Sequence, residues 1–180
     1  MDARPDLLTP RLVLRPLREA AADVDRLHAL LLRAEVRRYL CDDRVLARDE
    51  VAALLADAAA AAPQGLGLWW LSAAADPACA GCAGLLPVTT AAAHEPRLAG
   101  LVEPLVALAP EAWGRGYAAE ALGALVAHAF GALGLVRLAG VTDAPNAASA
   151  RMLERCGFQP LSEVEGPLHR LRTFLLERPA

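Results

Sequence analysis

Glycine and arginine residues at the start of a helical pattern are the part of the sequence best suited to chemistry. The apolar run Leu105–Leu108 is followed, after a short loop, by Trp113-Gly-Arg-Gly-Tyr-Ala118. Glycine allows a backbone to approach a ligand closely, and the N–H groups at a helix N-terminus favour anions. Arg115 adds a positive charge suited to phosphate oxygens. The pattern therefore predicts a loop that binds a pyrophosphate.

A dinucleotide-binding fold is the main alternative, because Gly114-x-Gly116-x-x-Ala119 also fits the Rossmann fingerprint. In that fold the first glycine follows its strand immediately, whereas here the loop 110–113 intervenes. The motif also sits late in the chain, and Asp143 comes too far downstream to hold a ribose. These departures disfavour a nicotinamide or flavin site.

Hydrophobic periodicity predicts the elements that would position this loop. We expect strands over residues 11–17, 68–73, 81–89, 98–108, 136–142, 158–165 and 168–176, and helices over 19–38, 46–62, 116–133 and 146–155. In chain order these are a strand, two helices, three strands, a helix, a strand, a helix and two strands. Such an order predicts one α/β domain over residues 1–180.

A second segment lies beyond the strand expected to follow the loop. It runs Asp143-Ala-Pro-Asn146-Ala-Ala-Ser149 and ends in Gly157-Phe158. Together with the Trp113–Ala118 segment, it closely resembles the GNAT superfamily of acetyl-CoA-dependent N-acetyltransferases. The opening Leu8–Leu17 is similar to the first strand of the Rim-type branch, which includes ribosomal-protein N-terminal acetyltransferases. The resemblance spans about residues 7–177. It implies a mixed central sheet of about seven strands, with a cleft where the fourth and fifth strands splay apart.

The resemblance also implies where acetyl-CoA would bind. The family's phosphate loop falls on Trp113, Gly114, Arg115, Gly116, Tyr117 and Ala118, with Trp113 in place of the usual polar residue. Pantetheine would lie between the splayed strands and pair with the backbone near Ala107 and Leu108. Asn146 matches an asparagine on the far side of the cleft, and it is equally suited to be a helix N-cap.

For catalysis, the resemblance places two candidates beside the cleft. Glu103 would be the base that takes the proton of the acceptor amine, or alternatively a salt-bridged or solvated strand glutamate. Ser149 would protonate the leaving thiolate, or alternatively serve as a small residue that lets its helix approach. Leu153 stands where many relatives carry a tyrosine acid. The favoured acceptor is an α-amino group of a peptide or protein, such as a basic ribosomal protein. An antibiotic or other small amine, or an acyl-CoA-binding module without catalysis, are the alternatives.

Composition excludes several other functions. The formal net charge is −3, whereas nucleic-acid-binding domains are usually basic. No long apolar stretch suggests a membrane span, and no secretory signal opens the chain, so we expect a cytoplasmic protein. Cys79-x-x-Cys82 lacks the second ligand pair of a zinc site and is expected in a turn entering a strand, so we expect no metal and reduced cysteines. The sequence does not indicate an oligomeric state.

Overall fold

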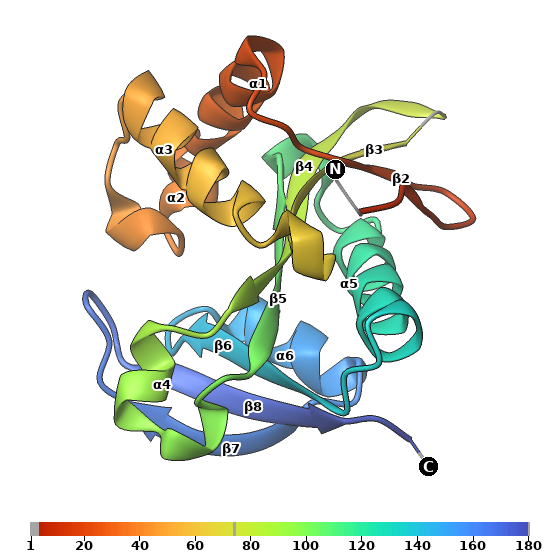
Figure 1. The fold of residues 1–180 in the computed structure, drawn as a ribbon. Coiled ribbons are helices and arrows are strands. Elements are labelled where there is room, and N and C mark those ends of the chain that lie inside the picture. Colours follow the sequence, from red (N-terminus) through yellow and green to blue (C-terminus); the bar gives the residue numbers. More distant parts are fainter. Residues whose placement is uncertain (1–3, 74, 180) are drawn as a thin grey trace.

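The strands form two antiparallel sheets in the computed structural model, which describes residues 4–73 and 75–179 (Figure 1). The larger sheet has the order β1-β2-β3-β4-β5 and the smaller the order β6-β8-β7. The strands are β1 (Leu7–Leu8), β2 (Val13–Pro16), β3 (Gly67–Ala73), β4 (Asp76–Pro87), β5 (Val102–Leu108), β6 (Arg137–Asp143), β7 (Gln159–Val164) and β8 (Leu171–Glu177).

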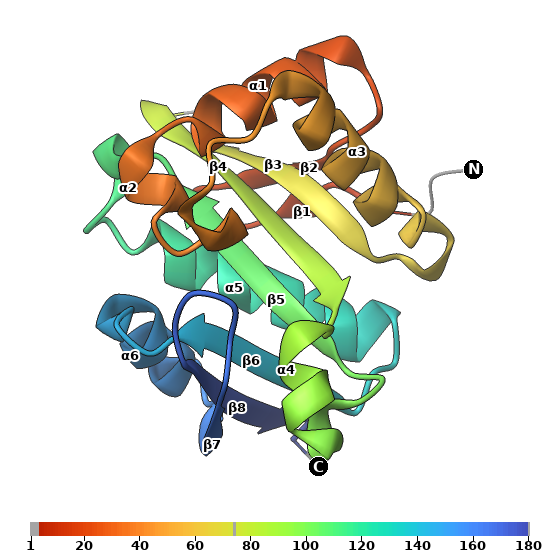
Figure 2. The same cartoon turned by 90° about the vertical axis from the view of Figure 1, so that its left-hand side faces the viewer.

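Helices cover both faces of the larger sheet (Figure 2). The helices are α1 (Ala21–Leu31), α2 (Ala34–Arg37), α3 (Arg48–Ala59), α4 (Thr90–His94), α5 (Tyr117–Ala127) and α6 (Ala147–Arg155). Helices α1 and α3 pack together on one face, α5 lies on the other, and α6 packs against the smaller sheet. None of the helices in the described ranges is long and apolar enough to cross a bilayer.

Alternation along β3 shows how the sequence builds a core on each face. Trp69 and Leu71 belong to the cluster that packs against α5, whereas Leu68 and Trp70 belong to the cluster beneath α1 and α3. Successive strand residues point to opposite faces, so a nearly continuous apolar run indicates a strand that is buried on both sides. The sheet is therefore a rigid layer between two sets of helices.

Strands β5 and β6 lie next to each other without forming a ladder. Their first residues are close together, because Val102, Val136 and Arg137 line one hollow. Toward their carboxyl ends the two strands move apart (Figure 2). Helix α5 follows β5 and α6 follows β6, so both helices begin near the open end of this gap.

The order of the major elements is confirmed, and several expected boundaries are wrong. The sheet is divided by the gap into two sheets. The expected helix 19–38 is broken at Arg33, which is extended and forms an ion pair with Glu111. The segment around Cys79 is not a turn, because β4 already begins at Asp76; the register of β4 against β3 shifts there, from Ser72 opposite Ala80 to Ala73 opposite Asp76. Residues Thr90–His94, which lie between the expected strands 81–89 and 98–108, form α4.

Two further differences concern strand and helix ends. Strand β5 begins at Val102 rather than at residue 98, because residues 96–98 form a 3₁₀ turn that starts at Pro96. Helix α5 ends at Ala127 and continues as a wider π-helical turn over His128–Ala132. The short strand β1 was not expected at all. Two residues are too few for hydrophobic periodicity to reveal.

Candidate active site

The N-terminus of α5 has the geometry of an anion site. Gly114 and Gly116 have φ values of +72° and +79°, a left-handed conformation that glycine adopts without strain. Gly116 is the N-cap residue of α5, and as a glycine it has no side chain that could cap the first turn. The first N–H groups of a helix have no intrahelical acceptor, so the start of α5 presents backbone donors such as Ala118 N–H to a ligand. A Cβ atom at Gly114 would meet nothing within 4 Å, so the loop is open on that side.

Arg115 is held beside this loop by the hairpin between β3 and β4. Its guanidinium forms an ion pair with the carboxylate of Asp76, which also accepts a hydrogen bond of 3.1 Å from the Tyr117 hydroxyl. The carboxylate raises the pKa of Arg115. The Arg115 side chain is half exposed, so it stays within reach of solvent. Part of its charge is thus already balanced before any phosphate binds.

A second arginine fixes the loop from the other side. Arg11 donates to the Arg115 carbonyl at 3.0 Å and forms an ion pair of 2.6 Å with Glu120, and its guanidinium lies 4.7 Å from the centre of the Tyr117 ring. Glu120 also accepts from the Thr9 hydroxyl. These contacts tie the N-terminal strands to the first turns of α5 and stabilise the loop conformation.

The edge of β5 that faces the gap is defined by its pairing with β4. Ala109 N donates to Ala80 O, and Val88 N donates to Leu101 O. Backbone groups alternate in direction along an antiparallel strand, so the odd-numbered residues of β5 pair with β4. Ala107 lies opposite Cys82 in this ladder. The contact expected near Ala107 would therefore be made by its even-numbered neighbours, one of which is Leu108.

The Trp113 side chain lies at the carboxyl end of this β5 edge and is bonded to it. Its indole Nε1–H donates to the carbonyl of Leu108 at 2.9 Å, and the residue is 50% exposed. The side chain of Leu108 is buried against the α5 core. Trp113 therefore contacts the strand through its ring nitrogen rather than only extending the phosphate loop.

Asn146 and Ser149 lie together at the start of α6. The Asn146 side-chain oxygen accepts from Ser149 N at 3.1 Å, so Asn146 is the N-cap of this helix. Its amide NH₂ group is not used in that bond. Leu153, four residues beyond Ser149, is buried in the same core as Phe158. The position where the resemblance would place a tyrosine acid therefore holds a core residue, and Ser149 is the hydroxyl on this turn.

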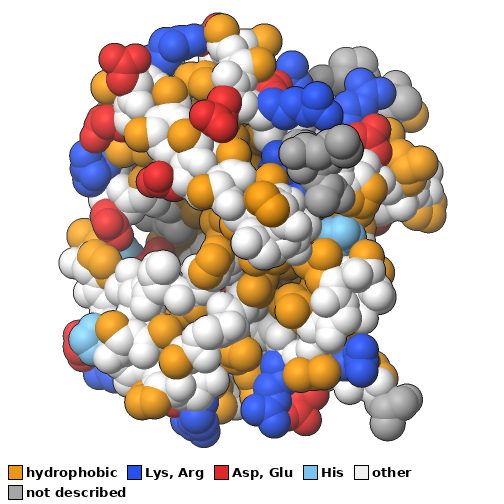
Figure 3. All heavy atoms as spheres, in the orientation of Figure 1, with side chains coloured by type: hydrophobic (Ala, Val, Ile, Leu, Met, Phe, Trp, Pro, Cys, Tyr) orange, Lys and Arg blue, Asp and Glu red, His pale blue; other side chains and the backbone are white. Residues whose placement is uncertain are grey.

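Glu103 is placed differently from the other candidates. It is the second residue of β5, and alternation puts its side chain with Leu105 on the face covered by α1 and α3. Figure 3 shows a hollow on this side, between those helices and the region of α4. Burial raises the pKa of Glu103 to about 7. No ion pair or hydrogen bond of its carboxylate is found among the described residues.

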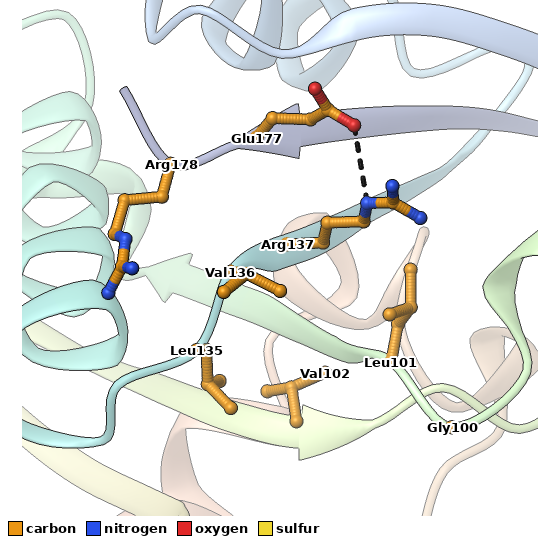
Figure 4. Close-up of a pocket in the computed structure, with 8 residues that line it drawn as sticks. All are labelled: Gly100, Leu101, Val102, Leu135, Val136, Arg137, Glu177 and Arg178. Atoms are coloured by element: carbon orange, nitrogen blue, oxygen red, sulfur yellow. Dashed lines mark ion pairs between the residues drawn. The ribbon is translucent and has the colours of Figure 1, made fainter. Parts of the chain in front are cut away.

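A separate hollow of about 450 Å³ lies at the other end of the gap (Figure 4). Val102 and Leu135 form its apolar floor, and the ion pair between Arg137 and Glu177 lies at its rim. It is at the amino ends of β5 and β6, whereas α5 and α6 begin near their carboxyl ends. The hollow is therefore not part of the candidate site.

Other candidate groups do not join the site. Within residues 4–73 and 75–179, no cluster of His, Cys, Asp and Glu side chains could hold a metal ion. Cys82 is buried and free, and the side chain of Cys79 lies outside the described residues. His28 and His128 contact the backbone carbonyls of Leu46 and Gly65.

Several residues of the site could not be identified from the sequence. No motif in the sequence marks Asp76 or Glu120 as part of the site. Their role becomes visible only in the fold, where Asp76 pairs with Arg115 and Glu120 pairs with Arg11. Val106 belongs to the site because of the register of β5 against β4. The alternation of an extended strand could have suggested Val106, but only with the partner strand known.

Comparisons with known proteins agree on one family. Residues 11–159 match the family model described as an acetyltransferase (GNAT) domain. A stretch of 50 residues is 44% identical to the "Uncharacterized N-acetyltransferase YoaA" of Bacillus subtilis (strain 168). That match spans 28% of this chain and 28% of the length of that protein.

Solved structures share the fold over almost the whole chain. A putative GnaT-family acetyltransferase from Bordetella pertussis is 27% identical with a TM-score of 0.81, covering 96% of this chain and 99% of that one. A ribosomal L7/L12 alpha-N-protein acetyltransferase in complex with coenzyme A is 16% identical with a TM-score of 0.76, covering 96% and 98%. At that identity the second likeness concerns the fold alone.

Proposed function

The chain belongs to the GNAT acetyltransferase family, and on that premise we propose that it transfers an acetyl group from acetyl-CoA to a primary amine. The observation that carries the proposal is the uncapped, glycine-flanked N-terminus of α5, which lies at the open end of the gap between β5 and β6. This arrangement suits a ligand that has a pyrophosphate at one end and an extended arm at the other.

Acetyl-CoA would be held by groups of two kinds. The N–H groups of residues 114–118 would bind the pyrophosphate. Arg115 would add positive charge, part of which its ion pair with Asp76 balances in the free protein. The pantetheine arm would enter the gap along the free edge of β5, with the Asn146 amide on the opposite side. The donors would be mainly backbone groups, so Trp113 in place of a polar residue should not abolish binding.

The reaction is attack of a neutral amine on the thioester carbonyl. A C–N bond forms, the C–S bond breaks, the amine loses a proton, and coenzyme A leaves as its thiolate. Glu103 would accept the proton, directly or through a water, because its raised pKa leaves it partly ionised at neutral pH and ready to take a proton. Ser149 would donate to the leaving sulfur. A thiol pKa of about 8.5 makes that help a modest one.

We favour an α-amino group of a peptide or protein as the acceptor, as in the Rim-type branch. An α-amine has a pKa of about 7.7–8.0 and a lysine side chain about 10.4, so only the α-amine is appreciably neutral near pH 7. A single carboxylate base of pKa about 7 is matched to that nucleophile. The ribosomal L7/L12 alpha-N-protein acetyltransferase, which shares the fold, is named for an acceptor of this class.

Two experiments test the proposal in sequence. Calorimetry with coenzyme A and acetyl-CoA measures binding, and release of the free CoA thiol measures turnover. The acceptors are peptides with free N-termini, matched peptides that are N-acetylated and carry lysine, and aminoglycosides. We expect turnover mainly with the free N-termini. Preference for the blocked lysine peptides or for an aminoglycoside would contradict the acceptor class, and binding without turnover would indicate an acyl-CoA-binding module.

A further inference from the structure

The gap-facing edge of β5 carries a short and bounded set of hydrogen-bonding groups. The odd-numbered residues pair with β4, so the groups that face the gap are those of Pro104, Val106 and Leu108. Val106 offers both its N–H and its C=O. Pro104 offers only a C=O, because proline has no N–H. Leu108 offers its N–H, whereas its carbonyl already accepts a hydrogen bond from the Trp113 indole.

This set is closed at both ends. Beyond Leu108 the next residue of the same parity is Pro110, which again has no N–H. At the amino end of the edge, Pro104 has no N–H and so provides no donor. The preceding even-numbered residue, Val102, lies where β5 approaches β6. What remains between the ends is two acceptors and two donors. That number matches two amide groups, each with one N–H and one C=O, whichever way the partner runs.

We propose that Trp113 and Pro104 are positioning residues that fix the register in which the arm of acetyl-CoA pairs with β5. The inference rests on the proposed function. Pantetheine contains two amides, so its arm can satisfy all four groups in one register only. Trp113 stays bonded to Leu108 while the cofactor is bound and prevents a register shifted outward, and Pro104 prevents one shifted inward.

Register matters because the arm has a fixed length and is anchored at the α5 N-terminus. A strand rises about 3.3 Å per residue, and shifting by one repeat of the edge moves the arm by two residues, about 7 Å. Glu103 lies three residues inward from Val106 on the same strand. A shift of one repeat would therefore bring the thioester short of Glu103 or carry it past that carboxylate.

The first test needs no acceptor. In ¹H–¹⁵N spectra the indole resonance of Trp113 is assigned by its loss in Trp113→Phe, and its hydrogen exchange is measured with and without coenzyme A. We expect the indole N–H to keep its protection in the complex, while the amides of Val106 and Leu108 become protected. Loss of indole protection on binding would mean that the cofactor displaces Trp113, and would overturn the proposal.

The second test separates positioning from binding. Trp113→Phe keeps a ring but frees the Leu108 carbonyl, so the outer register gains one hydrogen bond and its population relative to the productive register should rise about two- to tenfold. Pro110 still leaves the outer register one bond short of the productive one, so we expect kcat to fall by at most about twofold, with the Kd for coenzyme A within threefold of wild type. Trp113→Gln is the matched rescue, because its Nε2 is as many bonds from Cβ as the indole Nε1, and it should recover most of kcat.

Pro104→Ala adds a donor at the inner end and gives an independent measurement. We expect the same pattern, a lower kcat with an unchanged or tighter Kd, at a melting temperature close to that of wild type. An unchanged kcat in Trp113→Phe or Pro104→Ala, or a raised Kd with normal kcat, would overturn the role of the residue concerned. Failure of the wild-type protein to bind coenzyme A would instead refute the proposed function.

Discussion

Replacing Glu103 by glutamine tests both the environment of this carboxylate and its role as the base. Burial raises its pKa from an ordinary 4.5 to about 7. A carboxylate with a raised pKa stabilises the fold fully only below its unfolded pKa, and this stability is lost as the pH rises through the folded value. Glutamine keeps the shape and removes the ionisation. The wild-type protein should therefore lose stability between pH 5 and pH 8 relative to Glu103→Gln.

The size of this difference follows from the shift. Each pKa unit corresponds to 1.36 kcal/mol, and a shift between about 4.5 and 7 predicts a relative loss of about 2 kcal/mol from pH 5 to pH 8. Urea unfolding of both proteins at the two pH values measures it. Glu111→Gln is the matched control. Arg33 lowers the pKa of Glu111, so that carboxylate is ionised throughout this range and its removal should leave the pH dependence unchanged.

The same variant reports on catalysis. If Glu103 takes the proton of the amine, kcat/KM of the wild type should rise with pH through an inflection near 7, and in Glu103→Gln this inflection should be absent, leaving only that of the acceptor amine at about 7.7–8.0. At pH 8 the loss of a general base should lower kcat by about 10²–10⁴-fold. Equal pH dependence of stability in the two proteins would refute the burial argument. A wild-type kcat and pH profile in the variant would refute the catalytic role.

Four further changes test the rest of the site. Gly116→Val forces a β-branched residue into φ +79° and should lower the affinity for coenzyme A at least about tenfold in calorimetry, whereas Arg115→Ala should cause a smaller loss because Asp76 already balances its charge; equal losses would contradict the backbone role of the loop. Ser149→Ala should lower kcat only about two- to tenfold, since a thiolate leaves readily; a loss near that of Glu103→Gln would contradict this. Asn146→Ala should lower the free energy of unfolding by about 1 kcal/mol through loss of the α6 cap, and unchanged stability in urea would show the cap to be unimportant.

The parts of the site that are local in sequence could be predicted, and the parts that depend on strand register could not. Gly114 and Gly116 at the start of α5, and Asn146 at the start of α6, follow from the chemistry of helix N-termini. The ion pair of Arg115 with Asp76 joins residues on different elements and depends on where the β3–β4 hairpin ends. The sequence contains no signal for that distance.

The same reason explains what was missed in the fold. The break between α1 and α2 has no glycine or proline to mark it, and it coincides with the ion pair of Arg33 and Glu111 between distant segments. Glu103 was located correctly on its strand, but its burial depends on how the helices and the smaller sheet surround β5. Sequence patterns therefore indicate which residues can act, and tertiary packing decides their pKa and their partners.

The alternation of paired and unpaired groups along β5 also has a dynamic consequence. A hydrogen-bonded amide exchanges its proton only when the structure opens, whereas an unbonded amide at an open edge exchanges with water directly. In the free protein, Leu105 and Ala107 should hold their protons far longer than Val106 and Leu108 between and beside them. Neighbouring amide protons of one strand would thus exchange at very different rates. A bound ligand that accepts hydrogen bonds from Val106 and Leu108 would slow their exchange toward that of Leu105 and Ala107.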